Sequence, residues 1–308
     1  MLNHYQEGEG HINKVTIGLD IAKSVFHLVV MNQSGRVLKK KKLKRYQVLS
    51  YFSQLEPSIV VMEACGSCHY WCRELTKAGH EVKAIAPQYV VAYRKSNKHD
   101  YNDAEAIAEA SQREGMRFVP FKSQEQQDIQ LMHRIRERMI AQQTALSNQI
   151  RGSLAEYDIV YARGVATVVK ELPFTLEEAD NGLSMLARQL FQGLFNDLLV
   201  LRERIKEMDK ELKAFAQNHP VCERLMSMTG IGPLIATALY AGIGQGQAFN
   251  SGRHLAAWLG IVPKQHTTGD NPRLLGISKR GNTYLRTQMI NGARAALRHI
   301  GDKTDRVS

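Results

Sequence analysis

Short apolar runs rich in β-branched residues are confined to the first 120 positions of this chain, and that confinement most restricts its fold. KVTIGLD at 14–20, SVFHLVVMN at 24–32 and GRVLKKK after a turn signal at 32–35 predict three antiparallel strands. SIVVMEA at 58–64 is typical of a buried central strand. Further strands are expected at 80–86 and 116–121, with helices at about 46–55, 68–78 and 102–113. The first part of the chain is therefore predicted to be an α/β domain.

The pattern changes after residue 121, where helical periodicity continues to about residue 217. One face of a first long helix carries Met132, Ile135, Met139, Leu146, Ile150 and Leu154. In a second helix, apolar residues alternate spacings of four and three, as in a coiled-coil seam: Leu194, Leu198, Leu201, Ile205, Met208, Leu212 and Phe215. Such a seam packs either against a helix of the same chain or against a second copy, and the spacing does not decide between them.

Glycine-rich turns, small residues and many Arg and Lys residues mark the chain after Pro220. This stretch is expected to form a third compact unit that is mostly helical. We therefore expect an α/β domain over 12–121, a helical coiled-coil connector over 122–220 and a C-terminal domain over 221–308. The polar ending GDKTDRVS is abrupt, which is compatible with truncation of the last domain.

The balance of charge is basic, with 41 Lys and Arg against 30 Asp and Glu, so a polyanionic partner is the leading explanation. Lys39, Lys40, Lys41 and Lys42 form a dense run that either lies against phosphate or blunts a solvated edge strand. No apolar run approaches the roughly 20 residues needed to span a bilayer, and the polar N-terminus lacks the apolar core of a signal peptide. We therefore expect a cytoplasmic protein without a membrane partner.

Four carboxylates stand where strands end or a helix begins. Asp20 closes the first predicted strand, Glu63 closes the central strand, and Asp100 and Asp103 open a helix at a spacing that puts both on one face. In an RNase H-like sheet, the ends of the first and fourth strands and a following helix converge. Such a cluster of hard oxygen ligands binds Mg²⁺ or Mn²⁺ for phosphodiester chemistry. Turn or cap roles are the alternatives for the three aspartates, whereas a carboxylate after SIVVM is costly to bury.

The segment LMSMTGIGPLIATALYAGIG at 225–244 shows two apolar helices joined by a tight turn, the pattern of a helix–hairpin–helix motif. Gly230 and Gly232 would let backbone N–H groups approach a phosphate at the N-terminus of the second helix. A plain helical hairpin with a glycine turn is the alternative. The segment that follows favours nucleic acid, because it is lined by basic residues: Lys264, Arg273, Lys279, Arg280, Arg286, Arg294 and Arg298.

Cys65, Cys68, His69 and Cys72 form a C-x₂-C-H-x₂-C cluster with the spacing of half a zinc site. The three cysteines fall on one face of the helix predicted after Glu63, so we expect buried thiols that pack against the sheet. Four cysteines in the whole chain do not make a disulfide framework.

Three motifs in order carry a family resemblance: GLDIAK with Asp20, MEACGS with Glu63, and RKSNKHDYNDAEAIAEA with Asp100 and Asp103. Together they resemble the DEDD transposases of the IS110 and IS1111 insertion-sequence group, over about residues 14–298. The resemblance implies a RuvC-like, RNase H-like fold that binds Mg²⁺ through the four carboxylates. It also implies a C-terminal transposase domain with a serine nucleophile just before a glycine, and a structured bridge RNA that selects the DNA sequence.

The chain departs from that family at the nucleophile. Alignment on Pro263 and Gly269 puts Thr268 at the serine position, with Thr267 beside it. A threonine hydroxyl can attack a phosphate, but its β-methyl group restricts χ1 and crowds the approach. Ser278, in GISKRG, is a fallback nucleophile, although its basic surroundings favour phosphate binding.

The resulting hypothesis is a transposase or site-specific recombinase that cuts and rejoins double-stranded DNA at element ends and targets. It would act as a homo-oligomer, a dimer or a tetramer, associated with the nucleoid. A metal-dependent junction nuclease that uses water, and a catalytically inactive nucleic-acid-binding relic, stay open as alternatives. A sugar-kinase-like ATPase is a further alternative, because GLDIAK resembles the first phosphate loop of such enzymes. It is disfavoured because no later Gly-rich phosphate loop follows.

Overall fold

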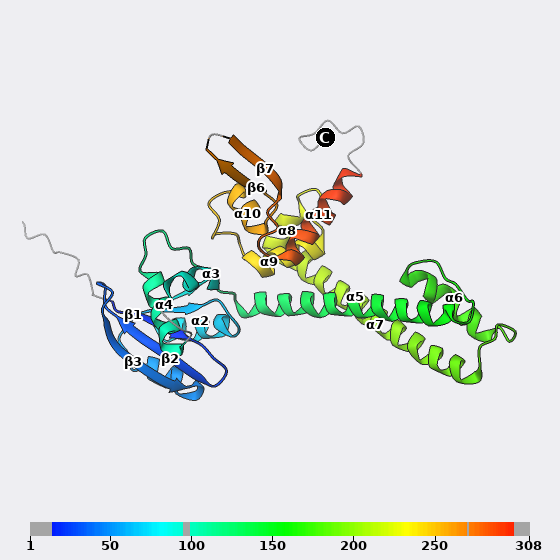
Figure 1. Ribbon diagram of the computed structural model, residues 1–308, viewed down its shortest axis with the longest axis horizontal. Helices are drawn as coiled ribbons and strands as arrows, with labels where there is room; N and C mark the ends of the chain where they lie inside the picture. Colours follow the sequence, from blue (N-terminus) through cyan, green and yellow to red (C-terminus); the bar gives the residue numbers. More distant parts are fainter. Residues whose placement is uncertain (1–13, 95–98, 270, 299–308) are drawn as a thin grey trace, which may run out of the picture. The chain divides into compact units, whose positions relative to one another are not determined.

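The computed structural model of the protein describes residues 14–94, 99–269 and 271–298. The chain divides into two compact units, Met1–Ser123 and Gln124–Ser308, and each is described by itself (Figure 1). The expected domain start at residue 12 and the polar ending at 301–308 lie outside the described residues. The division of the sequence into three parts remains a prediction.

A five-stranded mixed sheet forms the first unit, in the order β3–β2–β1–β4–β5. The strands are β1 (Thr16–Asp20), β2 (Val25–Met31), β3 (Val37–Lys44), β4 (Ile59–Glu63) and β5 (Glu81–Ile85). β1, β2 and β3 are antiparallel neighbours, whereas β4 runs parallel to both β1 and β5. The expected antiparallel trio and the expected buried strand are therefore confirmed, as is the mixed α/β class of this part of the chain.

Helices cover both faces of this sheet. They are α1 (Val48–Phe52), α2 (Cys68–Lys77), α3 (Pro87–Val90) and α4 (Asp100–Ser111), with the 3₁₀ turns η1 (Arg45–Gln47) and η2 (Val91–Tyr93). Leu19, Phe26 and Met62 point to one face and share a core with residues of α1 and α2. Val29 and Val61 point to the other face, where they pack with residues of α4. Successive side chains of a strand alternate between faces, so each strand contributes to both cores.

The prediction of a strand over 116–121 is wrong in its length, because only a single bridge forms there. Phe118 makes a single bridge to Ile85, and the amide of Val119 donates to the carbonyl of Ala84 at 2.7 Å. Pro120 follows directly and has no N–H to donate, so the pairing cannot continue as a ladder.

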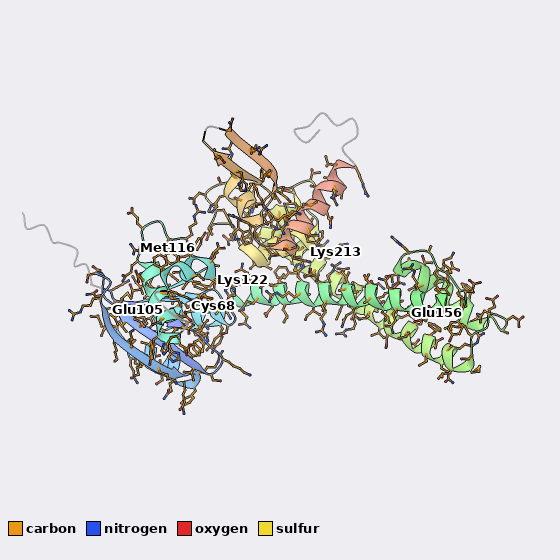
Figure 2. All side chains as sticks on the ribbon, in the orientation of Figure 1. Cys68, Glu105, Met116, Lys122, Glu156 and Lys213 are labelled. Atoms are coloured by element: carbon orange, nitrogen blue, oxygen red, sulfur yellow. The ribbon has the colours of Figure 1, made fainter. Side chains whose placement is uncertain are left out.

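The basic run lies on β3, which is an edge strand of the sheet. Lys40 pairs with Glu105 of α4 at 2.8 Å, a residue labelled in Figure 2. Lys41 lies over the ring of Tyr51 at 4.1 Å from its centroid. Lys39 also lies over the ring of Tyr51, at 6.0 Å from its centroid. Three of the four lysines therefore contact the protein itself, as expected for an edge strand blunted by lysine, while Lys42 is exposed.

The second unit contains seven helices and one strand pair among its described residues. They are α5 (Gln124–Ala155), α6 (Val165–Glu177), α7 (Met185–Asn218), α8 (Pro220–Met226), α9 (Pro233–Ile243), α10 (Gly252–Leu259), β6 (Pro263–Thr268), β7 (Asn271–Ile277) and α11 (Thr283–Leu297). α5 and α7 lie side by side, and α6 packs against both (Figure 1). Ile150, Leu172 and Leu198 belong to the core that these three helices share.

The apolar seam of α7 faces its own chain. Leu198 and Leu212 are buried, and the other five seam residues are partly buried along the helix that α5 contacts. Ile129 of α5 shares an apolar cluster with Leu212. Packing within the chain therefore accounts for the seam, and a second copy is not needed to cover it.

The region after residue 220 is not as helical as expected. Residues 263–277 form the antiparallel pair β6–β7, whose strands are joined at Gly269 with φ +61°. Pro263 and Pro272 disfavour a helix here, and the β-branched Thr267 and Thr268 favour extended backbone. The strand pair is exposed along nearly its whole length.

His133 of α5 forms hydrogen bonds with side chains of α9 and α11. Its Nδ1 lies 2.9 Å from the hydroxyl of Tyr284 in α11, and its Nε2 lies 3.0 Å from Oγ1 of Thr237 in α9. The Thr237 hydroxyl also lies 2.9 Å from the carbonyl of Pro233, to which it donates. It therefore accepts from Nε2–H of the histidine, and Nδ1 accepts from Tyr284.

None of the described helices combines the length and the apolar composition that a membrane span requires.

Candidate active site

Asp20 and Glu63 end two neighbouring strands at the same edge of the sheet. β1 and β4 pair in parallel, with Leu19 beside Met62, so the next residue of each strand is the carboxylate. By strand alternation, both side chains point to the face that α4 covers. The expectation that the ends of the first and fourth strands converge is confirmed by this pairing.

Asp100 and Asp103 lie in the first turn of α4, which begins at Asp100 as predicted. The preceding residue, His99, caps the helix by accepting from the amide of Tyr101 at 3.3 Å. The N-terminus of a helix carries a partial positive charge, which favours two carboxylates there. Asp103 is buried, whereas the side chain of Asp100 is 61% exposed.

Gly18 allows α4 to approach β1 closely. A Cβ at Gly18 would overlap the carbonyl oxygen of Ala104 and would lie 2.8 Å from the amide nitrogen of Ala108. Because Ala104 follows Asp103 directly, this backbone contact brings the first turn of α4 over the end of β1. The glycine was not singled out from the sequence, although it stands two residues before Asp20 on the same face.

A guanidinium group already offsets part of the negative charge. Nε of Arg94 lies 2.7 Å from Oδ1 of Asp103, and its Nη2 lies 3.9 Å from Oε2 of Glu63. Arg94 therefore bridges the carboxylate of β4 and the buried carboxylate of α4. Asp20 and Asp100 lie outside this ion-paired group.

The pKa of Asp20 reports the crowding of negative charge. Burial makes the largest contribution, and the nearby Asp103, Asp100 and Glu63 add to it, so that the pKa of this carboxyl rises from 3.8 to about 6 despite a smaller lowering by Arg94. Like charges held together in a partly buried position disfavour ionisation unless a cation joins them. Perturbed carboxylates of this kind are typical of functional sites.

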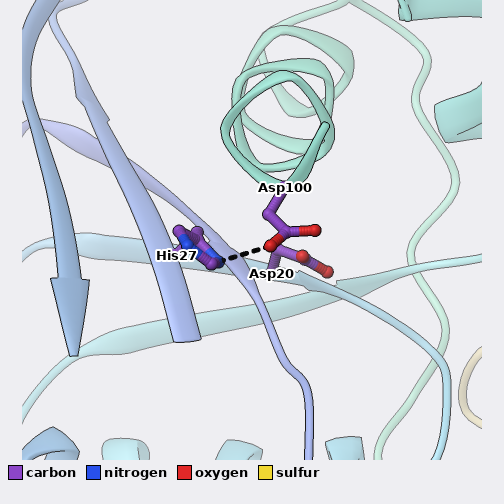
Figure 3. A group of neighbouring side chains, drawn as sticks. All are labelled: Asp20, His27 and Asp100. Atoms are coloured by element: carbon purple, nitrogen blue, oxygen red, sulfur yellow. Dashed lines mark ion pairs between the residues drawn. The ribbon is translucent and has the colours of Figure 1, made fainter. Parts of the chain in front are cut away.

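His27 is the site residue that the sequence did not reveal. It lies on β2 directly opposite Asp20, and its Nδ1 lies 3.3 Å from Oδ2 of Asp100 (Figure 3). Burial lowers the pKa of the imidazole, with Lys42 and His99 acting in the same direction and Asp100 opposing. The signal available was the hairpin register, which makes residues 20 and 27 cross-strand neighbours on one face.

The donor set fits a divalent cation. Among the described residues, the ligand atoms of Asp20, His27 and Asp100 all lie within 4.8 Å of one another. Glu63 and Asp103 supply further carboxylate oxygens beside Arg94. Hard oxygen donors that already raise the pKa of one member are suited to Mg²⁺ or Mn²⁺, because bound cations relieve that repulsion.

Thr268 belongs to the second unit, whereas the carboxylates belong to the first. It is the last residue of β6, pairs with Asn271 of β7 and is exposed. Ser278 follows β7, and its Oγ is buried without a hydrogen-bond partner in the described part of the chain. Of these two hydroxyls, only that of Thr268 is open to a substrate in this structure.

The predicted basic contacts divide into two groups. Lys264, Arg273, Lys279 and Arg280 are exposed on or next to the β6–β7 pair. Arg286 is buried instead, and its guanidinium donates to the carbonyls of Leu259 at 3.2 Å and Arg280 at 2.9 Å and to Oγ1 of Thr283 at 3.1 Å. Arg286 therefore holds the loop before α11, which explains its position without a phosphate.

Gly230 and Gly232 stand in the turn between α8 and α9. Gly230 has φ +86°, and a Cβ there would lie 2.9 Å from the carbonyl oxygen of Gly292 in α11. Its lack of a side chain is thus required by the turn and by the packing of α11. A Cβ on Gly232 would meet no atom within 4 Å, so packing does not explain this second glycine.

The cysteine cluster does not form a zinc site among the described residues. Cys68, labelled in Figure 2, and Cys72 are buried with their sulfur atoms 3.7 Å apart, as expected for thiols packed against the sheet. Cys65 is exposed, which the prediction of a shared buried face did not foresee. Burial raises the pKa of the Cys65 thiol to about 11, so the thiolate form that zinc requires is disfavoured.

The chain is similar to known transposases over nearly its whole length. Residues 17–159 match the family model of the IS110 DEDD transposases, and residues 222–307 match that of the transposase IS116/IS110/IS902 family. A "Probable family 20 transposase" of Pseudomonas aeruginosa is 45% identical over 96% of this chain and 87% of its own length. The transposase for insertion sequence element IS1111A of Coxiella burnetii is 44% identical over 95% of this chain and 80% of its own length. The transposase for insertion sequence element IS1328 of Yersinia enterocolitica is 34% identical over 96% of this chain and 88% of its own length.

A mixed sheet and a covering helix that each carry two of the four carboxylates, together with these matches, define an insertion-sequence DNA transposase. The chain belongs to the IS116/IS110/IS902 transposase family, with the DEDD match over residues 17–159 and the second match over residues 222–307.

Proposed function

We propose that this transposase cuts and rejoins double-stranded DNA at element ends and targets, with divalent metal ions held by Asp20, Glu63, Asp100 and Asp103. The observation that carries the proposal is the convergence of these carboxylates on one face, where burial and then their mutual repulsion raise the pKa of Asp20 to about 6. The strand order and the parallel β1–β4 pair support a RuvC-like, RNase H-like fold. Such a cluster of partly buried carboxylates is unfavourable in its ionised form, and a bound cation would offset the repulsion that Arg94 leaves.

Mg²⁺ or Mn²⁺ in this site would act as a Lewis acid on a phosphate oxygen. The residues of the chain supply the rest of the arrangement. Gly18 sets the approach of α4, and Arg94 orients Glu63 and Asp103 through its two ion pairs. A fixed guanidinium also offsets negative charge next to the reacting phosphate, as expected for a preorganised site.

Thr268 is the proposed nucleophile. Its Oγ1 attacks a phosphorus atom of the DNA backbone, an Oγ1–P ester forms, and one P–O bond of the strand breaks. The hydroxyl proton leaves with the departing oxygen, and rejoining reverses the exchange with a different strand end. The exposed position at the end of β6 supports access to DNA, and the β-methyl group predicts a slow reaction.

The proposed nucleic-acid surface includes the exposed Lys264, Arg273, Lys279 and Arg280 and the backbone at Gly232. Lys39, Lys40, Lys41 and Lys42 would add phosphate contacts on the first unit, with Lys40 and Lys41 weakened by their contacts within the protein. We leave Arg286 out because its donors are used by the protein, and Gly230 because its packing explains it. A structured bridge RNA is the proposed second nucleic-acid partner, since base pairing would then select the target.

A homo-oligomer is proposed because strand exchange needs several cuts in concert. The seam from Leu194 to Phe215 is occupied by the chain's own helices. Met185, Leu186 and Leu190, in the first two turns of α7, are exposed apolar residues and offer a contact surface instead. Sedimentation in the presence and absence of DNA should show an assembly larger than one chain, and a monomer under both conditions would contradict this.

The nucleophile is tested by trapping a covalent adduct on a nicked or branched DNA substrate with Mg²⁺ present. Thr268→Ser should raise the amount of adduct, because it removes the crowding methyl group. Thr268→Val should abolish it, because valine keeps the branched shape and removes the hydroxyl. Peptide mapping must place the DNA on residue 268, and an adduct on Ser278 would move the nucleophile.

A junction nuclease that uses water is the second candidate function. It requires only the carboxylates, which all lie within the first unit, and no group of the second unit. Metal-dependent cleavage that persists in Thr268→Val without an adduct would establish this alternative. DNA binding without any reaction of the wild type or of Thr268→Ser would instead identify an inactive binding protein.

A further inference from the structure

We infer that His27 supplies a nitrogen ligand to the metal site, so that the position beside Asp20 and Asp100 selects a first-row transition ion such as Mn²⁺ over Mg²⁺. The inference deepens the proposed metal-dependent function and rests on it. It adds one side chain to the four carboxylates and makes one of the two ends of the site chemically different from the other.

The placement of the imidazole is the first argument. His27 is only 7% exposed, and its Nδ1 points toward the carboxylates from β2, across the strand pair from Asp20. Nδ1 lies 3.3 Å from Oδ2 of Asp100 (Figure 3). Two ligands that each lie about 2.1 Å from one ion are at most about 4.2 Å apart, so this pair fits a shared ion without movement.

The orientation of the ring is the second argument. The edge of Tyr101 packs against His27 with centroids 4.8 Å apart and an interplanar angle of 78°. Tyr101 is in turn stacked on His99, the cap of α4, at 5.8 Å. Tyr101 follows Asp100 directly, so the same turn of helix holds both the carboxylate and the ring that fixes the imidazole.

The difference between the two ends of the site is the third argument. On one side, Asp20, Asp100 and His27 converge within 4.8 Å with a mixed oxygen and nitrogen donor set. On the other side, Glu63 and Asp103 offer oxygen only and are bridged by Arg94. Mg²⁺ prefers ligands that are all oxygen, whereas imidazole suits first-row transition ions. The nitrogen therefore biases the Asp20 end toward Mn²⁺.

The test uses the full-length protein without nucleic acid and loads it with one equivalent of Mn²⁺. Pulsed electron paramagnetic resonance should detect ¹⁴N coupling to the bound ion in the wild type and none in His27→Gln. Calorimetry should show that His27→Gln weakens Mn²⁺ binding by about tenfold or more, a loss typical of removing a metal-site partner. Mg²⁺ affinity should change by less than about threefold, since that ion gains little from the nitrogen.

Two further variants keep the inference falsifiable. His27→Asn puts an amide oxygen near the place of Nδ1, so it should still bind Mn²⁺ without ¹⁴N coupling and with less preference over Mg²⁺. His99→Gln is the matched control, because it removes the neighbouring imidazole that stacks on Tyr101, and it should keep the coupling.

Binding of Mn²⁺ tests the carboxylate site, and ¹⁴N coupling to the bound ion tests the role of His27 separately. Mn²⁺ binding that Asp20→Asn abolishes, without ¹⁴N coupling in the wild type, would leave the carboxylate site intact and overturn the role of His27. It would mean that His27 only donates a hydrogen bond to Asp100. Coupling that survives in His27→Gln and disappears in His99→Gln would also overturn it. Absence of any Mn²⁺ or Mg²⁺ binding would overturn both proposals.

Discussion

The backbone of Gly18 touches the backbone of Ala104, so β1 and α4 meet without a side chain between them at the point where their carboxylates gather. A helix on a sheet usually rests on a layer of side chains. Here the missing Cβ lowers α4 toward the strand and brings Asp103 over Asp20. The arrangement of these carboxylates thus depends on a residue that carries no functional group.

Gly18→Ala should therefore damage both stability and activity. The new Cβ would overlap the carbonyl oxygen of Ala104, and neither backbone can move without disturbing the core. We expect a loss of about 3 kcal/mol in the free energy of unfolding, at the upper end of overpacking substitutions, and loss of metal-dependent cleavage. Urea denaturation measures the first effect. Gly66→Ala is the control, because a Cβ there would meet no atom within 4 Å. Equal stabilities of the two variants would contradict the argument.

Asp20→Asn should stabilise the metal-free protein at neutral pH. The pKa of Asp20 is about 6 in the folded chain and near 3.8 when unfolded, so the folded state retains a proton that the unfolded state loses. Stability therefore falls as pH rises from 3.8 to about 6 and stays lowered above it. Asparagine removes this loss. Denaturation midpoints with chelator present should be higher for the variant at pH about 7 and should converge near pH about 4.

With added Mn²⁺, the denaturation midpoint of the wild type should exceed that of Asp20→Asn, because the ion stabilises only the wild type. Its affinity for the wild type should rise as pH passes about 6, since binding displaces the proton from Asp20. A metal affinity that does not change between pH about 5 and about 7 would show that Asp20 is not a ligand.

His133 should make the second unit sensitive to acid. Burial lowers the pKa of this imidazole from 6.5 to about 4, with Arg136 acting in the same direction. Below pH 6.5 the imidazole of His133 binds a proton in the unfolded chain but stays neutral in the folded chain. The free energy of unfolding therefore decreases as pH falls from 6.5 toward about 4. The full loss is about 3 kcal/mol. His133→Gln should lower stability at neutral pH but flatten this dependence, and an unchanged slope would assign the acid sensitivity to other groups.

The two glycines of the α8–α9 turn should separate folding from DNA binding. Gly230→Ala is expected to destabilise the second unit by about 1–3 kcal/mol, because φ is +86° and Gly292 lies behind it. Gly232→Ala should leave stability nearly unchanged, since its φ is −91° and the space around it is open. If the N-terminus of α9 approaches a phosphate, Gly232→Ala should still weaken duplex binding, as measured by fluorescence anisotropy. Unchanged affinity would place the phosphate contact elsewhere.

The sequence predicted those features whose signal is local. Short apolar runs rich in β-branched residues located the strands, because these strands are buried on both faces. The heptad spacing of Leu198 and Leu212 located the long helix, because that pattern arises from one buried face. Asp20, Glu63, Asp100 and Asp103 could be placed because each stands at the boundary of an element. The pair β6–β7 was missed because its strands bury neither face, and so they show no alternation.

The rest of the site depends on contacts between distant segments. His27 lies within an apolar run and reads as a core residue until the hairpin register pairs it with Asp20. Arg94 meets Glu63 and Asp103 only because the chain folds back between β5 and α4. The packing of the α7 seam against α5 was left open by the heptads, since the same spacing serves either partner.

The β6–β7 pair should tolerate substitutions better than the rest of the second unit. Both strands are exposed and pair only with each other, so their side chains contribute little to the stability of the unit. The loops at their base are different, because Gly260 and Gly281 allow backbone contacts with Arg280 and Trp258 that no side chain could share. Substitutions in the β6–β7 pair should thus change the stability of the second unit little. If Thr268 is the nucleophile proposed above, the identity of this residue is then constrained by the reaction with DNA and not by the fold.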